Sequence, residues 1–421
     1  MNQLFVYACF DWLPAPQPMG ELGYESLRGT DSYSFRFNEE WLRNHGALFI
    51  SADLRNFPGA QFTLPGRDIF GSFSDALPDR WGRLLLSRRE QILVAEEHRP
   101  VRRLSSFDYL TGIDDFSRMG ALRFKFSPDG DFINTAGRLR IPPLADLRSL
   151  VAASHEVERN EEKNTLPDKR WLQQLVNPGS SLGGARPKAG VLDSEGRLCV
   201  AKFPSRSDDY DVALWEHLCH LLARKAGIVV SDTSVISVGE RHHTFLSRRF
   251  DRTDDGCRRH FASAMTLLGL SDGCNAATGN GYVDIVDFIV QHCCDVERNL
   301  RQLYRRVAFN IAVGNSDDHF RNHGFLLTPR GWTLAPAYDI NPTLDTHQSL
   351  LINRTSNASD IAQLLTSSDD YMIPREEARI IVEEVCRAVS KWQILASRLK
   401  APQREIDYFK GVFTRNANPT V

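Results

Sequence analysis

The second half of the chain carries the strongest periodic pattern of apolar residues. It predicts a helix at residues 209–226, where one face is apolar: Val212, Trp215, Leu218, Cys219, Leu222 and Ala223. Gly227 can end this helix in the left-handed conformation that glycine adopts without strain. Further helical patterns lie at residues 284–295, 297–313 and 374–391. The C-terminal half is therefore predicted to be mainly helical.

Short apolar runs separated by turn residues dominate the first part of the chain. We expect strands at residues 1–11, 48–50, 62–64 and 120–126. A helix should begin at Pro78 and Asp79, because apolar residues follow Asp79 at helical spacing. These patterns predict a β-rich subdomain at residues 1–125.

Three pairs of short strands flank turn sequences and predict hairpins. The pairs are residues 191–192 with 198–203, 235–238 with 244–247, and 324–327 with 332–334. We assign residues 126–252 to a second β-rich region and residues 253–421 to a helical region, joined near the Arg249–Arg252 segment. The predicted fold class is α+β.

Composition narrows the class of protein. The 421 residues carry a formal net charge of -2, which argues against a dedicated nucleic-acid binder. No apolar run is long enough to predict a membrane-spanning helix, and the N-terminus lacks the basic start of a signal peptide. The eight cysteines form no CxxC pair, which favours reduced thiols in a cytoplasm over a zinc site or a disulfide framework.

The most informative polar pattern joins Asp317, Asn322 and Asp339. Protein kinases need one carboxylate to accept the proton of a substrate hydroxyl, and an amide and a second carboxylate to hold a metal that bridges to phosphate. The predicted hairpin at residues 324–334 would bring Asn322 and Asp339 back to one site. Because Asp and Asn are also frequent in turns, a solvated turn is the alternative interpretation.

A kinase also needs a lysine for the nucleotide phosphates, held by a glutamate on a helix. Lys202 ends an apolar run, and Glu216 on the following helix can point back at the sheet. A lysine inside an apolar strand loses hydration unless an anion meets it. We therefore favour an ion pair between these two residues over a surface lysine at a strand end.

A Gly/Ser-rich stretch at residues 179–190 precedes that strand, where a loop over the phosphates would lie. Glycine allows close approach of the backbone to an anion. The stretch matches neither of the common phosphate-loop patterns, so a flexible loop is the alternative. Ser180 and Ser181 are candidate phosphorylation sites, and Arg186 and Lys188 are the nearby cations.

Two histidines, His319 and His323, lie within and beside the Asp317–Asn322 run. Their spacing could suit zinc on a helix, but no H-E-x-x-H motif accompanies them. Such histidines more often hydrogen-bond a loop backbone and hold a neighbouring carboxylate in place.

Taken together, these motifs occur in the order found in the HipA family of serine/threonine kinase toxins, which the chain resembles over nearly its whole length. The motifs are residues 77–82, 180–189, 201–204, 249–252, 315–322 and 336–340. The resemblance implies a two-lobed, protein-kinase-like fold. In it, residues 1–125 form an accessory subdomain, residues 126–252 the N-lobe and residues 253–421 the helical C-lobe.

The resemblance also implies roles for particular residues. Asp317 matches the catalytic base, Asn322 and Asp339 match the metal ligands, and Ser181, or its neighbour Ser180, matches a loop serine that such kinases phosphorylate in themselves. The residues that we assign to binding of ATP are Lys202, Glu216, Ser181, Gly183, Gly184, Lys188 and His319. Where some members carry a glutamate near the hinge-like segment, this chain has Arg248, so the contacts to adenine are not predicted.

The function that we expect is an ATP- and Mg²⁺-dependent protein serine/threonine kinase that acts as the toxin of a toxin–antitoxin module. The family implies a HipB-like, DNA-binding antitoxin as partner, with DNA reached only through it, and an aminoacyl-tRNA synthetase as the substrate class. The alternatives are a catalytically inactive component that binds nucleotide or antitoxin, and a kinase acting on a small molecule.

Overall fold

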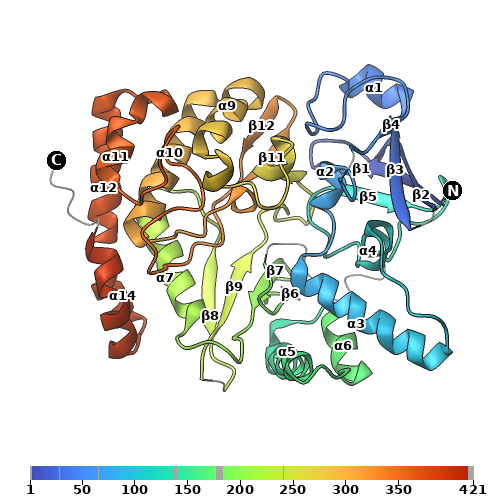
Figure 1. The fold of residues 1–421 in the computed structure, drawn as a ribbon, viewed down its shortest axis with the longest axis horizontal. Coiled ribbons are helices and arrows are strands. Elements are labelled where there is room, and N and C mark those ends of the chain that lie inside the picture. The colour runs from blue at the N-terminus through green and yellow to red at the C-terminus, as the bar shows by residue number, and fades with distance from the viewer. Residues whose placement is uncertain are drawn as a thin grey trace. The chain divides into compact units, whose positions relative to one another are not determined.

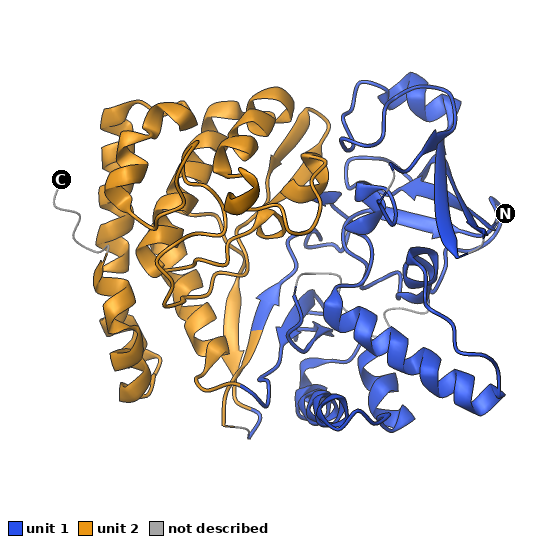
Figure 2. Ribbon diagram, viewed as in Figure 1, with its two compact units in different colours: residues 1–207, 238–240, 246–262 blue, residues 208–237, 241–245, 263–421 orange. Residues whose placement is uncertain are grey.

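A computed structural model describes residues 2–27, 29–64, 66–135, 141–176, 184–239 and 241–415. It divides into two compact units, which Figure 2 shows in separate colours. Unit 1 contains residues 1–207, 238–240 and 246–262, and unit 2 contains residues 208–237, 241–245 and 263–421. Figure 1 labels the helices and strands. The three domain boundaries expected from the sequence remain predictions.

Unit 1 is built around an antiparallel sheet with strand order β4-β3-β2-β1-β5. The strands of this sheet are β1 (Asn2–Ala8), β2 (Gln17–Leu27), β3 (Thr30–Phe37), β4 (Gln61–Phe62) and β5 (Leu122–Lys125). Unit 1 also contains the hairpin of β6 (Lys188–Leu192) and β7 (Leu198–Lys202). Its helices are α1 (Glu39–His45), α2 (Gly71–Ser74), α3 (Arg80–Glu97), α4 (Ser106–Gly112), α5 (Leu147–Glu162) and α6 (Lys169–Val176).

The sheet of unit 1 buries alternate residues, as a half-buried antiparallel sheet should. On β3, Tyr33, Phe35 and Phe37 are buried, and Phe35 packs edge-on against Phe37 and contacts Phe73 of α2. The strand expected at residues 48–50 is wrong. Ile50 is fully buried, but it lies in a loop, so its apolar character serves packing and not strand pairing.

Unit 2 is mainly helical, as the periodic pattern predicted. Its helices are α7 (Val212–Lys225), α8 (Ala264–Leu267), α9 (Tyr282–His292), α10 (Val296–Val313), α11 (Ile361–Thr366), α12 (Arg375–Val389), α13 (Trp392–Arg398) and α14 (Gln403–Arg415). Its strands are β8 (Thr233–Ile236), β11 (Gly324–Thr328) and β12 (Gly331–Leu334), while β9 (Thr244–Arg248) and β10 (Phe261–Ser263) have residues in both units.

Helix α10 is the centre of unit 2, and α9, α12 and α14 pack against it (Figure 1). Aromatic packing fixes α7 to the C-terminal helices. Trp215 contacts Phe409 and Trp392, and its indole N–H donates to the buried carboxylate of Glu405 at 2.9 Å. The predicted hairpins at β6–β7 and β11–β12 are confirmed as antiparallel pairs. Among the described residues, none of the helices combines the length and the apolar character that crossing a bilayer requires.

Candidate active site

The loop that carries Asp317 begins where helix α10 ends. Gly314 has φ +71 and turns the chain out of the helix, and its N–H bonds back to the carbonyl of Asn310. A β-carbon at this position would lie 2.3 Å from Val412 Cγ1 and 3.1 Å from the carbonyl oxygen of Thr343. The sharp turn and the tight packing together require glycine here. The direction in which the Asp317–Asn322 loop leaves α10 is therefore fixed by packing.

A buried carboxylate beside Asp317 anchors that loop. Asp318 Oδ2 accepts hydrogen bonds of 2.7 Å from Tyr282 of α9, Asn310 of α10 and His323. Burial alone would raise the pKa of Asp318, but His323 and the hydrogen bonds outweigh it and the pKa is lowered. Asp318 is thus held as a carboxylate that joins two helices to the loop. The expectation that a histidine of this segment holds a carboxylate in place is consistent with this contact.

Asp317 itself is exposed, in contrast to its neighbour. Its pKa is raised, first by partial desolvation and then by the negative charges of Asp339, Asp318 and Asp345, against the opposing effect of His319. A carboxylate crowded by other carboxylates is a feature of sites that hold a cation. Asp317, His319 and Asp339, three residues of the expected site, therefore lie within electrostatic reach of one another.

The two expected metal ligands are oriented by local contacts. Asn322 lies in a short 3₁₀ turn, and its amide N–H donates to the carbonyl of Asp317 at 3.2 Å, so its amide oxygen remains available. Asp339 has φ +58, a strained backbone conformation for a non-glycine residue, and Oδ1 accepts from Asn341 at 3.2 Å. Strained residues persist at sites where function requires a particular side-chain direction.

The residues fit a magnesium ion bound together with nucleotide better than a metal held by protein alone. Within the described part of the chain, no three His, Cys, Asp or Glu side chains gather as a metal site. Mg²⁺ needs only one or two protein ligands when phosphates supply the others. The carboxylates around Asp317 give the site an excess of negative charge. The buried Oδ1 of Asn341, which has no hydrogen-bond partner among the described residues, adds a neutral acceptor.

Three further residues that we assign from the sequence to binding of ATP are described by the structure: His319, Lys202 and Glu216. His319 is half-buried, and its Nδ1 has no hydrogen-bond partner in the described part of the chain. Lys202 ends β7 in unit 1, and Glu216 lies in α7 of unit 2, buried, with His220 4.0 Å from its carboxylate. The ion pair between Lys202 and Glu216 stays a prediction.

Lys188 makes a contact that the sequence did not suggest. Its ammonium lies 2.9 Å from Asp79 Oδ2, with both side chains buried, and it also donates to the carbonyl of Gly184 at 3.4 Å. Asp79 caps helix α3 at the same time, accepting from the N–H of Gly82. Lys188 therefore has a buried structural partner in Asp79, and its contact with a phosphate stays a prediction. Gly184 has φ +86, whereas Ser180, Ser181 and Gly183 lie outside the described residues.

The Arg249–Arg252 motif proves to be a buried ion cluster in unit 1. Asp251 is fully buried and accepts from Arg249 at 2.6 and 2.7 Å, from Arg252 at 2.7 Å and from the N–H of Gly120 at 2.8 Å. The motif thereby ties the segment after β9 to Gly120, just before β5. Arg248, just before it, pairs with Asp254.

Sequence reasoning missed the residues that hold the loop: Tyr282, Asn310, Asn315, Asp318 and Asn341. Tyr282 and Asn310 lie on helices, and no local sequence pattern indicates that their side chains contact Asp318. The sequence signal for this arrangement is the adjacent pair Asp317-Asp318. Successive side chains in a tight turn face different surroundings, so one carboxylate can be buried while the other is exposed.

Comparison with known proteins identifies the family. A model of the HipA-like C-terminal domain matches residues 180–393, which is just over half of the chain. The chain belongs to the HipA-like family. The matched region contains the Asp317–Asn322 loop and Asp339, together with β6, β7 and all but the first residue of the Gly/Ser-rich stretch.

Two curated relatives are similar over about half of this chain. A protein of Shewanella oneidensis called "Serine/threonine-protein kinase toxin HipA" is 24% identical over 237 residues, covering 49% of this chain and 54% of the relative. A "Putative kinase" of Haemophilus influenzae is 26% identical over 230 residues, covering 48% of this chain and 66% of the relative. The similarity thus spans between half and two thirds of these relatives.

The fold matches more completely than the sequence. The HipA chain in the Shewanella oneidensis complex of HipA, HipB and operator DNA superimposes with a TM-score of 0.69 at 16% identity, covering 98% of this chain and 96% of that one. The predicted α+β, kinase-like fold class and the predicted membership of the HipA family are both confirmed.

Proposed function

We propose that this HipA-like protein is an ATP- and Mg²⁺-dependent protein serine/threonine kinase. The observation that carries the proposal is the Asp317–Asn322 loop, anchored through Asp318, with its charges in electrostatic reach of Asp339. Asp317 accepts the proton of the substrate hydroxyl, and its exposure leaves it accessible to a protein substrate. A bound magnesium ion would neutralise charge on the transferred phosphate.

Further residues of the family-matched region would bind the nucleotide and its metal ion. Asn322 and Asp339 hold the metal, Lys202 binds the phosphates, and Glu216 orients Lys202. The Gly/Ser-rich stretch covers the phosphates and is phosphorylated at Ser181 or Ser180. The oriented amide of Asn322 and the strained backbone of Asp339 support the metal assignment.

We further propose that the protein is a cytoplasmic toxin that a HipB-like, DNA-binding antitoxin controls. The similar Shewanella oneidensis HipA is part of a complex with HipB and its operator DNA. Contact with DNA would be made through the antitoxin, in keeping with a net charge of -2. The substrate class that we propose is a translation-related protein, an aminoacyl-tRNA synthetase.

A magnesium titration with labelled ATP tests the proposal most directly. Purified wild type and Asp339→Asn are incubated with a cell lysate, and transfer of label to protein is measured as Mg²⁺ increases. Wild type should label itself and one lysate protein, whereas Asp339→Asn should need more Mg²⁺ or remain inactive. Equal labelling by both proteins at every magnesium concentration contradicts the metal assignment.

Absence of any labelling by wild type in this experiment would favour the inactive binding component instead. Label that appears only in small molecules of the lysate would favour a small-molecule kinase. Identification of the labelled protein by mass spectrometry then names the substrate.

A further inference from the structure

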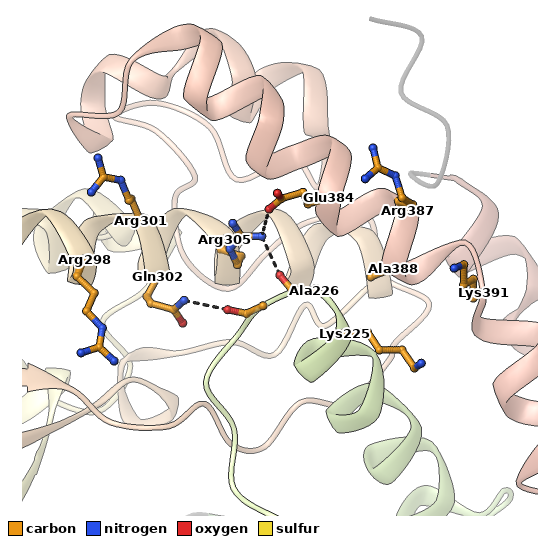
Figure 3. Close-up of a pocket in the computed structure, with 11 residues that line it drawn as sticks. Lys225, Ala226, Arg298, Arg301, Gln302, Arg305, Glu384, Arg387, Ala388 and Lys391 are labelled. Carbon is orange, nitrogen blue, oxygen red and sulfur yellow. Dashed lines mark hydrogen bonds and ion pairs between the residues drawn. The ribbon is translucent and has the colours of Figure 1, made fainter.

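A pocket in unit 2 is lined mainly by cationic side chains. It has a volume of about 720 Å³ and lies among the C-terminal end of α7, helix α10 and the end of α12 (Figure 3). Its charged lining comprises six cations and one carboxylate: Lys225, Arg298, Arg301, Arg305, Arg387, Lys391 and Glu384. The whole chain carries a formal net charge of -2, so this positive charge is a local excess.

Internal pairing neutralises only part of that excess. Arg305 contacts Glu384 at 2.7 Å and donates to the carbonyl of Ala226 at 2.8 Å, as Figure 3 shows. Arg301 pairs with Glu377 and Glu297 outside the pocket lining. Four of the lining cations are exposed and make no hydrogen bond or ion pair with any described residue: Lys225, Arg298, Arg387 and Lys391.

Like charges lie close together in this lining. Arg301 and Arg305 are one turn apart on α10, where carboxylates pair with both, whereas Arg387 is in the last turn of α12 and Lys391 follows two residues after that helix ends. Within the described part of the chain, no carboxylate partner offsets the repulsion between Arg387 and Lys391. A concave site that gathers unpaired cations from three helices has the character of an anion-binding pocket.

The chemistry of the lining indicates the class of anion. Arginine forks match the oxygens of phosphate, and lysines add flexible point charges. Aromatic side chains, on which a nucleobase could stack, are missing from the described lining. A chain of linked phosphates concentrates more negative charge in this volume than an acidic peptide does. The Glu384 carboxylate beside Arg305 shows that an anionic oxygen fits within the pocket.

We propose that this pocket binds a free oligophosphate anion, such as a short inorganic polyphosphate or the phosphate chain of a small ligand. Figure 3 shows Lys225, Arg387 and Lys391 toward one end of the pocket and Arg298 toward the other, so the cations are spread along it. The proposal does not depend on kinase activity, because none of these residues belongs to the catalytic loop.

The test uses inorganic tripolyphosphate, full-length protein and magnesium-free buffer, with binding measured by calorimetry. The pocket variant is the double substitution Arg387→Gln with Lys391→Gln. Its matched control is Arg375→Gln with Lys410→Gln, which removes the same charge from exposed positions of α12 and α14 outside the pocket. Tripolyphosphate could also bind at the proposed nucleotide site. The quantity compared is therefore the part of tripolyphosphate binding that is lost in the pocket variant and kept in the control variant.

The dissociation constant should rise roughly tenfold or more in the pocket variant and less than twofold in the control, since each charged hydrogen bond is typically worth about that factor. Autophosphorylation and the melting temperature should match wild type in both variants. Lys225→Gln, at the exposed end of α7, provides a second and milder pocket variant. It should weaken tripolyphosphate binding in the same direction.

Three outcomes would overturn the proposal. One is tripolyphosphate binding of equal affinity and stoichiometry in wild type and pocket variant. Another is an equal loss in the control, which would show a general effect of net charge. The third is loss of duplex DNA binding in the pocket variant while tripolyphosphate binding persists, which would make this surface a contact for nucleic acid.

Discussion

At the scale of single residues, two adjacent aspartates receive opposite environments. Asp318 is buried and fully hydrogen-bonded, and its pKa is lowered, whereas Asp317 is exposed and its pKa is raised. One carboxylate anchors the loop, and the other is the one that we propose as the catalytic base. Asp251, a buried structural ion, contrasts in the same way with Asp339, a proposed metal ligand whose backbone lies in the left-handed region.

Replacing the proposed catalytic base should abolish chemistry without unfolding the protein. Asp317→Ala should lower the rate of phosphate transfer about 10²- to 10⁴-fold, which is the usual contribution of general-base catalysis. Because Asp317 is exposed, the melting temperature should stay within a degree or so of wild type, as changes at exposed positions usually have small effects. Rates are measured with labelled ATP, and Asp407→Ala on the exposed face of α14 is the control. A wild-type rate in Asp317→Ala would refute the assignment.

The buried ion cluster of unit 1 should make stability depend on pH in a defined direction. Burial would raise the pKa of Asp251, but Arg249 and Arg252 outweigh it and hold the pKa well below its ordinary value. A carboxylate with a depressed folded-state pKa stabilises the fold above its unfolded pKa of about 3.9, and this stability is lost as pH falls toward the folded value. The free energy of unfolding should therefore rise with pH in the range just below about pH 4.

Asp251→Asn tests this dependence. The substitution leaves Arg249 and Arg252 buried without their counter-ion, so it should cost about 3–5 kcal/mol at neutral pH. It should also flatten the rise of stability with pH, as measured by urea denaturation at several pH values. Asp129→Asn in an exposed turn is the control and should keep the wild-type slope. An unchanged slope in Asp251→Asn would contradict the proposed role of the cluster.

At the scale of elements, the end of helix α10 decides where the Asp317–Asn322 loop lies. Gly314→Ala should lower the free energy of unfolding by about 2–4 kcal/mol, because it adds left-handed strain and a contact with Val412 that cannot be accommodated. Gly279→Ala isolates the first effect, since Gly279 has φ +82 but nothing within 4 Å of the added β-carbon. It should cost only about 1–2 kcal/mol. Equal losses in the two variants, measured by urea denaturation, would show that packing against Val412 is unimportant.

At the scale of the whole molecule, the proposed loop phosphorylation would link the Gly/Ser-rich stretch to nucleotide binding. A phosphate at Ser181 adds about -1.5 to -2 charges, which oppose the phosphates of ATP and move the loop away from them. Protein incubated with ATP and Mg²⁺ should therefore carry one phosphate in this stretch and bind ATP less tightly. Because Lys188 is paired with Asp79, Arg186 is the more accessible local cation for that phosphate.

Mass spectrometry of the incubated protein decides this prediction. Ser181→Ala should lose the modification and Ser180→Ala should keep it, which also distinguishes the two serines. A preparation that phosphorylates a substrate but carries no phosphate between residues 180 and 188 would exclude this form of self-limitation.

The sequence by itself determined the secondary structure wherever a local pattern was strong, and it determined the family. The apolar face of α7, the start of α3 at Asp79 and the hairpin at β11–β12 are set by neighbouring residues, so the pattern predicted them correctly. The spacing of Asp317, Asn322 and Asp339 also depends only on the chain. The family match over residues 180–393 confirms the identification that these motifs suggested.

Only the tertiary structure decided which polar side chains are structural and which are left available. Burial combines with partners from near and far along the chain to hold Asp318, Lys188 and Asp251 in place. His323, Arg249 and Arg252 are near neighbours in sequence, but Tyr282 lies 36 positions from Asp318, Asp79 lies 109 from Lys188 and Gly120 lies 131 from Asp251, so no local pattern contains these distant partners. The cationic pocket is likewise assembled from three helices, whose charges meet only because the apolar faces of those helices pack together.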